Sequence, residues 1–163
     1  FDQHGLSKPV EGKSVILSRL LLVLVFCGPL SLSAQPQQQL MLGNQLFSFD
    51  VAADPDSRRE GLMGRELAAH TGMLFDFPAG TRPAIWMHNM QISLDLLFVS
   101  TDGRILHVFA AVPPCQQTPC SIYQATQPLR YVLELPAGTA QALDLKVGDQ
   151  LDMTGLPKSP PKL

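Results

Sequence analysis

Short apolar runs separated by turn signals fill most of the chain, and they constrain its fold more than any other feature. In Gln45–Val51 apolar and polar residues alternate, which is the period of a half-buried strand. Leu94–Ser100 and Ile105–Val112 flank Thr101–Arg104, whose Asp-Gly pair is a strong hairpin signal. We therefore predict a mainly β fold, a β-rich α+β domain. A small closed or partly open β-barrel is the expected form, because closure removes exposed strand edges.

Two short helices are expected among these strands. Asp54 is a typical N-cap residue and Pro55 suits the first helical position. This helix should run to about Met63 and stop near Gly64. The second helix is expected over Thr139–Leu145, with its first residue as the cap. The other expected strands are Leu40–Leu42, Gly72–Phe77, Ala84–Met90, Tyr131–Leu135 and Gln150–Thr154, with a long loop over Pro113–Pro128.

The first part of the chain resembles an export signal. Lys13 and Arg19 precede the apolar run Leu20–Phe26, and small residues follow up to Ala34. The run is shorter than the roughly 20 apolar residues that span a bilayer. We therefore expect a periplasmic or secreted protein with no stable membrane anchor after signal cleavage. The expected organisation is a signal peptide with an upstream extension over 1–34, a polar spacer over 35–39, one domain over 40–154 and a disordered tail over 155–163.

Two cysteines remain after the expected cleavage. Cys115 and Cys120 have the spacing C-x4-C in a proline-rich loop. Disulfides persist in exported proteins, so we interpret the pair as a structural disulfide that pins this loop. A redox-active or metal-binding pair is the alternative. Neither a flanking histidine nor a second C-x-x-C supports zinc.

Composition narrows the possible functions. The formal net charge is -2 and the pI is about 6.1, so the chain lacks the basic character of nucleic-acid binders. Its length of 163 residues suits one domain, and we expect a monomer whose partner is an unknown small molecule or a protein. The motifs of serine hydrolases, zinc proteases, phosphate loops and dinucleotide sites are absent from the sequence. The catalytic residues, if there are any, are unknown at this point.

The stretch Arg82–Val99 contains the only tryptophan and the most promising polar cluster. Side chains of an extended strand alternate between its two faces. One face then carries Trp86, His88 and Met90, and the other carries Ile85, Met87 and Asn89. If the second set faces the core, the first lines a cleft; in the reverse orientation, the asparagine is the exposed group. Both orientations are open at this stage.

Three ionisable residues have both a functional and a structural interpretation. His88 is either a general base or ligand, or a solvent-facing strand residue. Asp95 lies between leucines, where an unpaired carboxylate is costly, so it needs a partner. It is either a carboxylate with a perturbed pKa or a residue that caps a turn or strand. We interpret Glu134, in the run YVLEL, as the polar face of a strand.

Methionines accumulate near His88. Thioethers suit Cu(I), and an exported protein with this composition raises the possibility of a soft-metal site. Methionine is also the common filler of irregular cores. Only His88 and Met90 are expected to share a face, so we predict neither a bound metal nor a cofactor. The methionines concerned are Met63, Met73, Met87 and Met90.

Six short motifs occur in the order found in one family. They are RREGLMGR (Arg58–Arg65), GMLFDF (Gly72–Phe77), IWMHNMQISLDLLFV (Ile85–Val99), DGRI (Asp102–Ile105), CQQTPCSIY (Cys115–Tyr123) and YVLELPAG (Tyr131–Gly138). Together they resemble the uncharacterised prokaryotic family catalogued as domain of unknown function 192, over about 40–153. The resemblance implies a compact, mostly β, barrel-like domain that is often exported, and it implies no particular reaction.

The chain departs from this family at two positions. The family usually reads W-M-K-N-T where the chain has WMHNM, so His88 and Met90 replace lysine and threonine. This departure weakens a role for His88 as an indispensable catalyst. The matched positions are Arg59, Gly61, Trp86, Met87, Asn89, Asp95 and Tyr123.

These residues define three functional hypotheses. The first is a binding module for a small polar or anionic ligand, in which tryptophan supplies stacking area and asparagine supplies hydrogen bonds. Its candidate ligand-binding residues are Arg59, Trp86, Asn89, Asp95 and Tyr123, with His88 and Met87 as secondary candidates. The second is an enzyme that uses Asp95 in acid-base chemistry, with Arg59 stabilising an anion. The third is a structural or protein-interaction domain without pocket chemistry.

Overall fold

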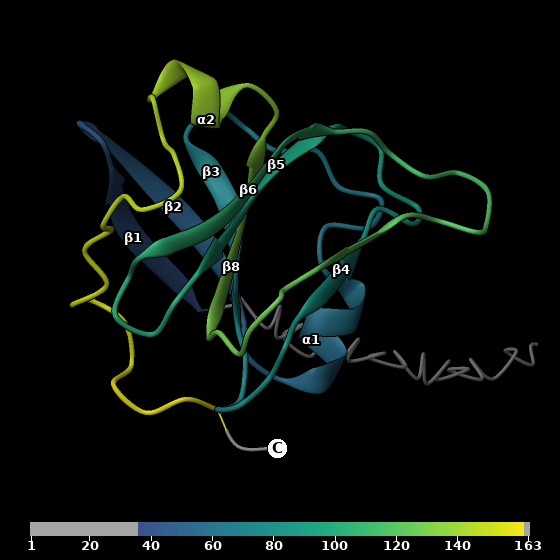
Figure 1. The fold of residues 1–163 in the computed structure, drawn as a ribbon. Helices are drawn as coiled ribbons and strands as arrows, with labels where there is room; N and C mark the ends of the chain where they lie inside the picture. The colour runs from purple at the N-terminus through teal and green to yellow at the C-terminus, as the bar shows by residue number, and fades with distance from the viewer. Residues whose placement is uncertain (1–35, 162–163) are drawn as a thin grey trace, which may run out of the picture. The chain divides into compact units, whose positions relative to one another are not determined.

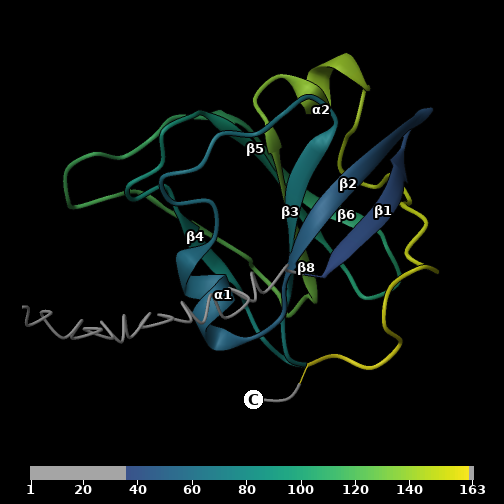
Figure 2. The same ribbon diagram turned by 180° about the vertical axis from the view of Figure 1, so that it is seen from behind.

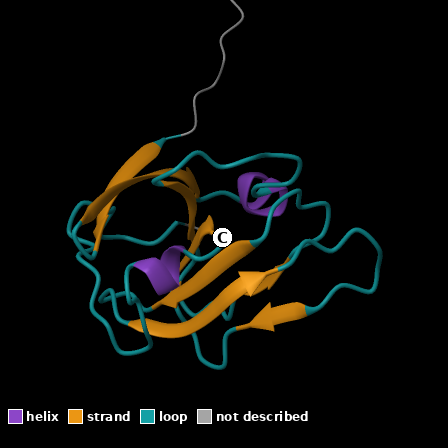
Figure 3. Ribbon diagram, turned by 90° about the horizontal axis from the view of Figure 1, so that it is seen from above, coloured by secondary structure: helices purple, strands orange, loops and turns teal. Residues whose placement is uncertain are grey.

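The computed structural model describes residues 36–161, and the expected signal peptide lies outside the described residues. Strands and loops make up most of this part of the chain, with two short helices (Figure 1; Figure 3). The elements are β1 (Gln37–Leu42), β2 (Gln45–Ala52), α1 (Pro55–Glu60), β3 (Thr71–Asp76), β4 (Ala84–Trp86), β5 (Leu94–Val99), β6 (Ile105–Val112), β7 (Ile122–Gln124), β8 (Tyr131–Pro136) and α2 (Thr139–Ala142). None of the helices within 36–161 is long and apolar enough to cross a membrane.

Eight strands form two sheets. The larger sheet has the order β1-β2-β3-β8-β5-β6, and its neighbours are antiparallel except for the parallel pair β2–β3. The smaller sheet is the antiparallel pair β4–β7. The mainly β class is confirmed, but the described strands do not close into a barrel. The reason is that β4 and β7 pair with each other, so β1 and β6 stay as the edges of an open sheet.

Most expected strands are present. The hairpin β1–β2 turns at Gly43, and β5 and β6 pair antiparallel around the predicted turn, with two register shifts. β8 covers the run YVLEL and lies between β3 and β5 in the middle of the larger sheet. A central strand is covered on both faces, which explains why its first five residues are all buried.

The start of α1 was predicted correctly and its end was not. Asp54 accepts hydrogen bonds from the backbone N–H groups of Asp56 and Ser57, at 3.0 Å each, and forms a capping box with Ser57. The helix ends at Glu60 rather than near Met63. Gly61 follows with φ 52°, a left-handed conformation that favours glycine and breaks the helix.

Other elements also differ from the prediction, and β1 begins at Gln37, within the expected polar spacer. β4 ends at Trp86, because the chain then turns through Asn89, which has φ 57°. α2 is only Thr139–Ala142, and its N-cap is Gly138. The predicted strand Gln150–Thr154 is reduced to one isolated bridge, between Gln150 and Arg104 in the turn before β6. The predicted loop Pro113–Pro128 contains the short strand β7.

The two faces of the larger sheet are both covered, by different parts of the chain. The α2 face packs against α2 and the segment 151–156, and it includes Leu97 and Leu133. The α1 face packs against the turn after α1 and against β4 and β7, and it includes Leu96 and Val132. Figures 1 and 2 show α1 beside β4, viewed from opposite sides. Alternation along β5 and β8 therefore assigns every second residue to each face.

A buried ion pair holds the segment that follows Leu151. Arg130 donates to the Asp76 carboxylate from Nε at 2.8 Å and from Nη2 at 3.0 Å, and both side chains are almost fully buried. Arg130 also donates to the backbone carbonyls of residues 157–159. We expected 155–163 to be a disordered tail. The structure describes this segment to residue 161, and Leu156 in it is buried.

Candidate functional site

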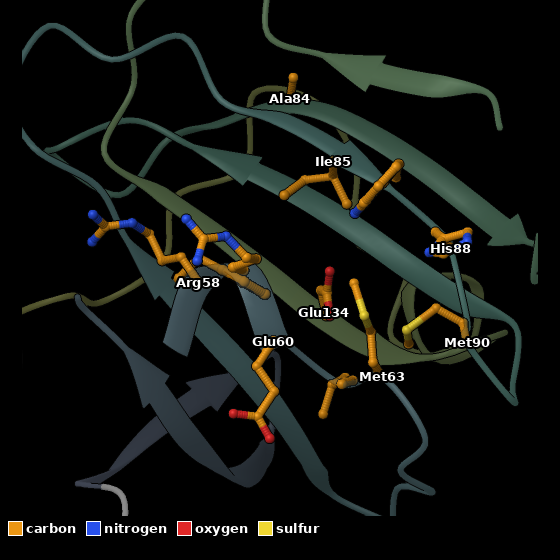
Figure 4. A pocket seen from close by; sticks show the side chains of 13 residues that line it. Arg58, Glu60, Met63, Ala84, Ile85, His88, Met90 and Glu134 are labelled. Carbon is orange, nitrogen blue, oxygen red and sulfur yellow. The ribbon is translucent and has the colours of Figure 1, made fainter. Parts of the chain in front are cut away.

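A pocket of about 210 Å³ lies on the α1 face, between α1 with its following turn, β4 and the larger sheet (Figure 4). Its apolar walls come from all three parts, and Figure 4 shows Arg58 at one end, His88 and Met90 at the other, and Glu134 between them. This volume is below the usual range for drug-sized ligands, so the pocket suits a small molecule. The apolar side chains of the lining are those of Leu62, Met63, Phe75, Ala84, Ile85, Trp86 and Met90.

Glu134 lies at the floor of this pocket, in the middle of β8. It is 4% exposed and lies beside Met73 of β3 and Leu96 of β5 in register. Among the residues that the structure describes, its Oε2 is the only buried side-chain oxygen or nitrogen without a hydrogen-bond partner. Burial raises the pKa of Glu134 to about 8, because the charged form loses its hydration. This raised pKa favours the protonated form of Glu134 at pH 7.

Glu134 is the main residue that our sequence analysis missed. We predicted that it lies on the polar, solvent-facing side of a strand, but that side of β8 is buried and forms the floor of the pocket. One signal was available: YVLEL lies between turns and is apolar on both faces except at this position. Such a run is typical of a central strand, in which a single carboxyl group has no solvent.

Two arginines from α1 line the pocket. Arg58 is half-buried, donates to the backbone carbonyls of Ala53 and Asp76, and lies over the Phe77 ring at 5.5 Å. These contacts fix its guanidinium at one end of the pocket. Arg59, a predicted candidate, is exposed and pairs with Asp56 at 3.3 Å. Both arginines add positive potential, and only Arg58 is held in one place by several partners.

Trp86 and His88 are at the mouth of the pocket. Trp86 is 45% exposed, and its ring stacks on the His88 ring at a centroid distance of 4.9 Å. The predicted alternation holds over Ile85–His88, where Ile85 and Met87 are buried and Trp86 and His88 are more exposed and line the cavity. It fails at the next two residues, because the chain turns after β4 and leaves Asn89 exposed and Met90 buried. An exposed indole that lines a cavity is available to stack on a ligand.

Asp95 is buried on the opposite face of the sheet from the pocket. Its Oδ1 accepts a hydrogen bond from the Ala111 N–H at 2.7 Å, and its Oδ2 accepts one from the Ala140 N–H of α2 at 2.8 Å. Ala111 belongs to an irregularity in β6 with φ 49°, and Ala140 is in the first turn of α2. Asp95 therefore joins three elements of the fold, and it does not line the pocket that contains Arg59.

The other candidates lie away from the pocket. Asn89 is exposed, and its backbone holds segments together: its N–H donates to Cys115 and its carbonyl accepts from Gly64, at 3.2 Å each. Its φ of 57° explains an asparagine there, because this residue tolerates the left-handed region. Tyr123 pairs with Ile85 and packs on Phe109 at 5.3 Å. Met87 and Tyr123 meet in a second depression, of about 280 Å³, next to the disulfide loop.

The expected disulfide is present. Cys115 and Cys120 are bonded, with Cα atoms 5.8 Å apart. Cys115 also forms a parallel bridge with His88, so the disulfide loop lies against the segment that follows β4. A larger depression, of about 850 Å³, lies around 150–158. Its buried charge, Arg130, is already paired with Asp76, so this depression has no unsatisfied group comparable to Glu134.

Comparison with known proteins agrees with this architecture. The sequence pattern of the family DUF192, described as Uncharacterized ACR, COG1430, matches residues 38–153. A crystal structure from Sinorhizobium meliloti 1021, called a "putative transcription regulator", is 33% identical with a TM-score of 0.67, covering 76% of this chain and 98% of that chain. A protein of unknown function from Novosphingobium aromaticivorans DSM 12444 is 28% identical with a TM-score of 0.64, covering 75% of this chain and 89% of that chain.

Among curated proteins, none matches this chain. The family match spans most of the sequence and almost all of the described strands. It confirms the resemblance that the six motifs indicated. The chain therefore belongs to the family of domains of unknown function 192.

Proposed function

We propose that this domain is an exported binding module that takes a small polar or anionic ligand in the pocket on the α1 face. The observation that carries the proposal is the buried Oε2 of Glu134, which faces this pocket without a partner. Buried polar groups are almost always hydrogen-bonded, and an orphaned one in a cavity indicates a missing partner. A ligand that bonds to this carboxyl group would supply it.

The charges around the pocket favour a polar or anionic ligand. With a raised pKa, Glu134 keeps its proton near pH 7 and can donate a hydrogen bond to an oxygen of the ligand. Arg58 and Arg59 add positive potential, which Glu60 at the same pocket and the partner of Arg59, Asp56, partly offset, and Trp86 offers its exposed ring for stacking. Export is supported by the signal-like segment before residue 35 and by the disulfide, which persists in oxidising compartments.

The charge of this chain gives no support for the regulatory role in the name of the Sinorhizobium meliloti relative. Nucleic-acid binding needs a basic surface, and the net charge of this chain is -2. The proposed partner is a small molecule and the proposed state is a monomer. The alternative of a structural or protein-interaction domain gives the unpaired Glu134 no role, because a buried carboxyl group without a partner destabilises a fold.

A ligand screen tests the proposal. Thermal-shift measurements on the full chain with small organic acids, amides and sugars should reveal ligands that stabilise it, as any ligand of the native state must. Glu134→Leu and Trp86→Ala should lose this stabilisation, and Glu66→Gln, an exposed change outside the pocket, should keep it. Ligands that bind Glu134→Leu and Trp86→Ala as tightly as the parent chain would contradict the proposal.

A second candidate function is an enzyme in which Glu134 is the general acid or base. A buried carboxyl group whose pKa is about 8 is suited to proton transfer near neutral pH. This candidate replaces our hypothesis of Asp95 with Arg59, since Asp95 is bonded on the other face. Glu134→Gln separates the two functions: an enzyme loses turnover while ligands still bind, and a binding module shows no turnover in either form.

A further inference from the structure

Two methionines line the end of the pocket that lies away from Arg58. Met63 comes from the turn after α1 and Met90 from the turn after β4, and both line the cavity together with His88. Figure 4 shows the Met63 and Met90 side chains converging beside Glu134, with His88 at the same end. The sequence analysis placed only His88 and Met90 on one face, and the fold adds the second thioether.

Backbone contacts hold these two methionines near each other. The Gly64 N–H donates to the Asn89 carbonyl at 3.2 Å, and these residues directly follow Met63 and precede Met90. The Met90 N–H donates to the Met87 carbonyl at 3.3 Å, which closes the turn that contains His88. The two thioethers therefore come from segments that are joined by a hydrogen bond next to both of them.

The chemistry of this end of the pocket suits a soft cation. Thioether sulfur and imidazole nitrogen are ligands for Cu(I), and they are poor ligands for Ca²⁺ or Mg²⁺. In the described part of the chain, no three His, Cys, Asp or Glu side chains cluster as a site for harder metals would require. The Trp86 ring stacks on the His88 ring at a centroid distance of 4.9 Å, and both residues line the pocket.

Met63 and Met90 line the pocket, whereas two other methionines of the same region do not. Met73, Met87 and Met90 are 0%, 2% and 4% exposed and belong to the apolar cluster of the α1 face, and of these three only Met90 lines the pocket. Met63 is half-buried at the cavity, so its sulfur has a route to solvent. Core filling explains Met73 and Met87, and it does not require the two other thioethers to meet beside a histidine.

We propose that Met63, His88 and Met90 form a binding site for Cu(I), or for Ag(I) as its chemical analogue. Trp86 and the unpartnered Glu134 carboxyl group line the same pocket. The site goes beyond the proposed function, because it uses the methionine end of the pocket and needs no organic ligand. Binding involves coordination only, with no change in the oxidation state of the metal.

The test is a titration of the full chain with Ag(I), and with Cu(I) supplied anaerobically as its bicinchoninate complex. Every sample carries Cys27→Ser, because Cys27 is the one cysteine outside the disulfide and a thiolate would bind Cu(I) itself. We expect one metal ion per chain to be taken from the complex. Fluorescence of Trp86, the only tryptophan, should be quenched in step with binding.

Conservative variants test the assignment. Met63→Leu, Met90→Leu and His88→Asn should each weaken binding by about 10- to 100-fold or more, as loss of a ligand or its support does. Met41→Leu, at an exposed site 47% accessible, and Met87→Leu, in the core, should bind like the parent. Leucine preserves volume, and a thermal melt of each variant shows that it is folded.

Two results would overturn the proposal. One is a Met63→Leu/Met90→Leu double variant that binds Ag(I) as tightly as the parent chain. The other is equal loss of affinity in the Met41 and Met87 controls, which would indicate non-specific binding by thioethers. Glu134→Leu tests binding of the organic ligand, and Met63→Leu tests binding of the metal. Failure of the metal proposal therefore leaves the proposed function standing, and failure of the proposed function leaves the metal proposal standing.

Discussion

Two of the buried carboxyl groups of the larger sheet lie in the adjacent strands β5 and β8, one on each face. Asp95 in β5 and Glu134 in β8 lie one register position apart, since Asp95 pairs with Leu135 and Glu134 with Leu96. Asp95 is fully buried on the α2 face and accepts two backbone hydrogen bonds. Glu134 is buried on the α1 face, and its Oε2 has no partner. Equal burial therefore has opposite consequences on the two faces.

The difference separates a structural group from a functional one. A carboxylate that satisfies two backbone N–H groups stabilises the elements that carry them. A carboxyl group that is buried without a partner costs stability, and a fold that retains it has it available for a ligand. From sequence, Asp95 looked the more promising site residue, and the hydrogen-bond partners reverse that order.

Asp95→Ala is the substitution with the largest expected effect. It leaves the Ala111 and Ala140 N–H groups without their acceptor in the interior. Each unsatisfied donor costs about 1–3 kcal/mol, so we expect a loss of about 4 kcal/mol in the free energy of unfolding. Urea denaturation measures it. Asp56→Ala, at an exposed helix position, is the control and should lose less than about 1 kcal/mol.

The pH dependence of stability tests the other carboxyl group. Glu134 has its pKa raised from 4.5 to about 8 in the folded state. Between these values the unfolded chain ionises while the folded chain keeps the proton, so the unfolded state binds fewer protons and stability falls as pH rises. One pKa unit corresponds to about 1.4 kcal/mol, and we expect a fall of a few kcal/mol between pH 5 and pH 9.

Glu134→Gln is the matched variant for this measurement. It keeps the shape and removes the ionisation, so its stability should change much less over the same range of pH. The groups that line the same pocket and carry charge, Arg58, Arg59, Glu60 and His88, are common to both proteins and cancel in the difference. Parallel curves for the parent chain and Glu134→Gln would contradict the assignment of a raised pKa to this residue.

Much of the fold followed from local patterns. Alternation and turn signals located the strands of the larger sheet, and the cap at Asp54 located the start of α1. Elements that depend on contacts distant in sequence were missed. β7 exists because it pairs with β4, and 150–154 has only one bridge because it packs as a cover on the α2 face. Neither arrangement is encoded in the pattern of its own segment.

The candidate site was predicted only in part, for the same reason. Alternation correctly placed Trp86 and His88 on a cavity, because the two are close in sequence. The roles of Asp95 and Glu134 depend on which face of the sheet each side chain lies on, the α2 face or the α1 face. Their own sequence segments do not determine this. Asn89 is explained by its left-handed backbone conformation, which sequence alone did not distinguish from a ligand contact.

The substitution with the smallest expected effect on stability is Trp86→Ala, at the pocket. Trp86 is the only tryptophan, but it is 45% exposed and stacks mainly on His88. We expect Trp86→Ala to lower the free energy of unfolding by about 1 kcal/mol, because much of its apolar surface is already in water. Leu133→Ala, fully buried on the α2 face, should cost about 3 kcal/mol. Circular dichroism during urea denaturation measures both, since Trp86→Ala has no tryptophan fluorescence. Equal losses would mean that the pocket face is packed as tightly as the α2 face, and Trp86 would then be a core residue rather than one available to a ligand.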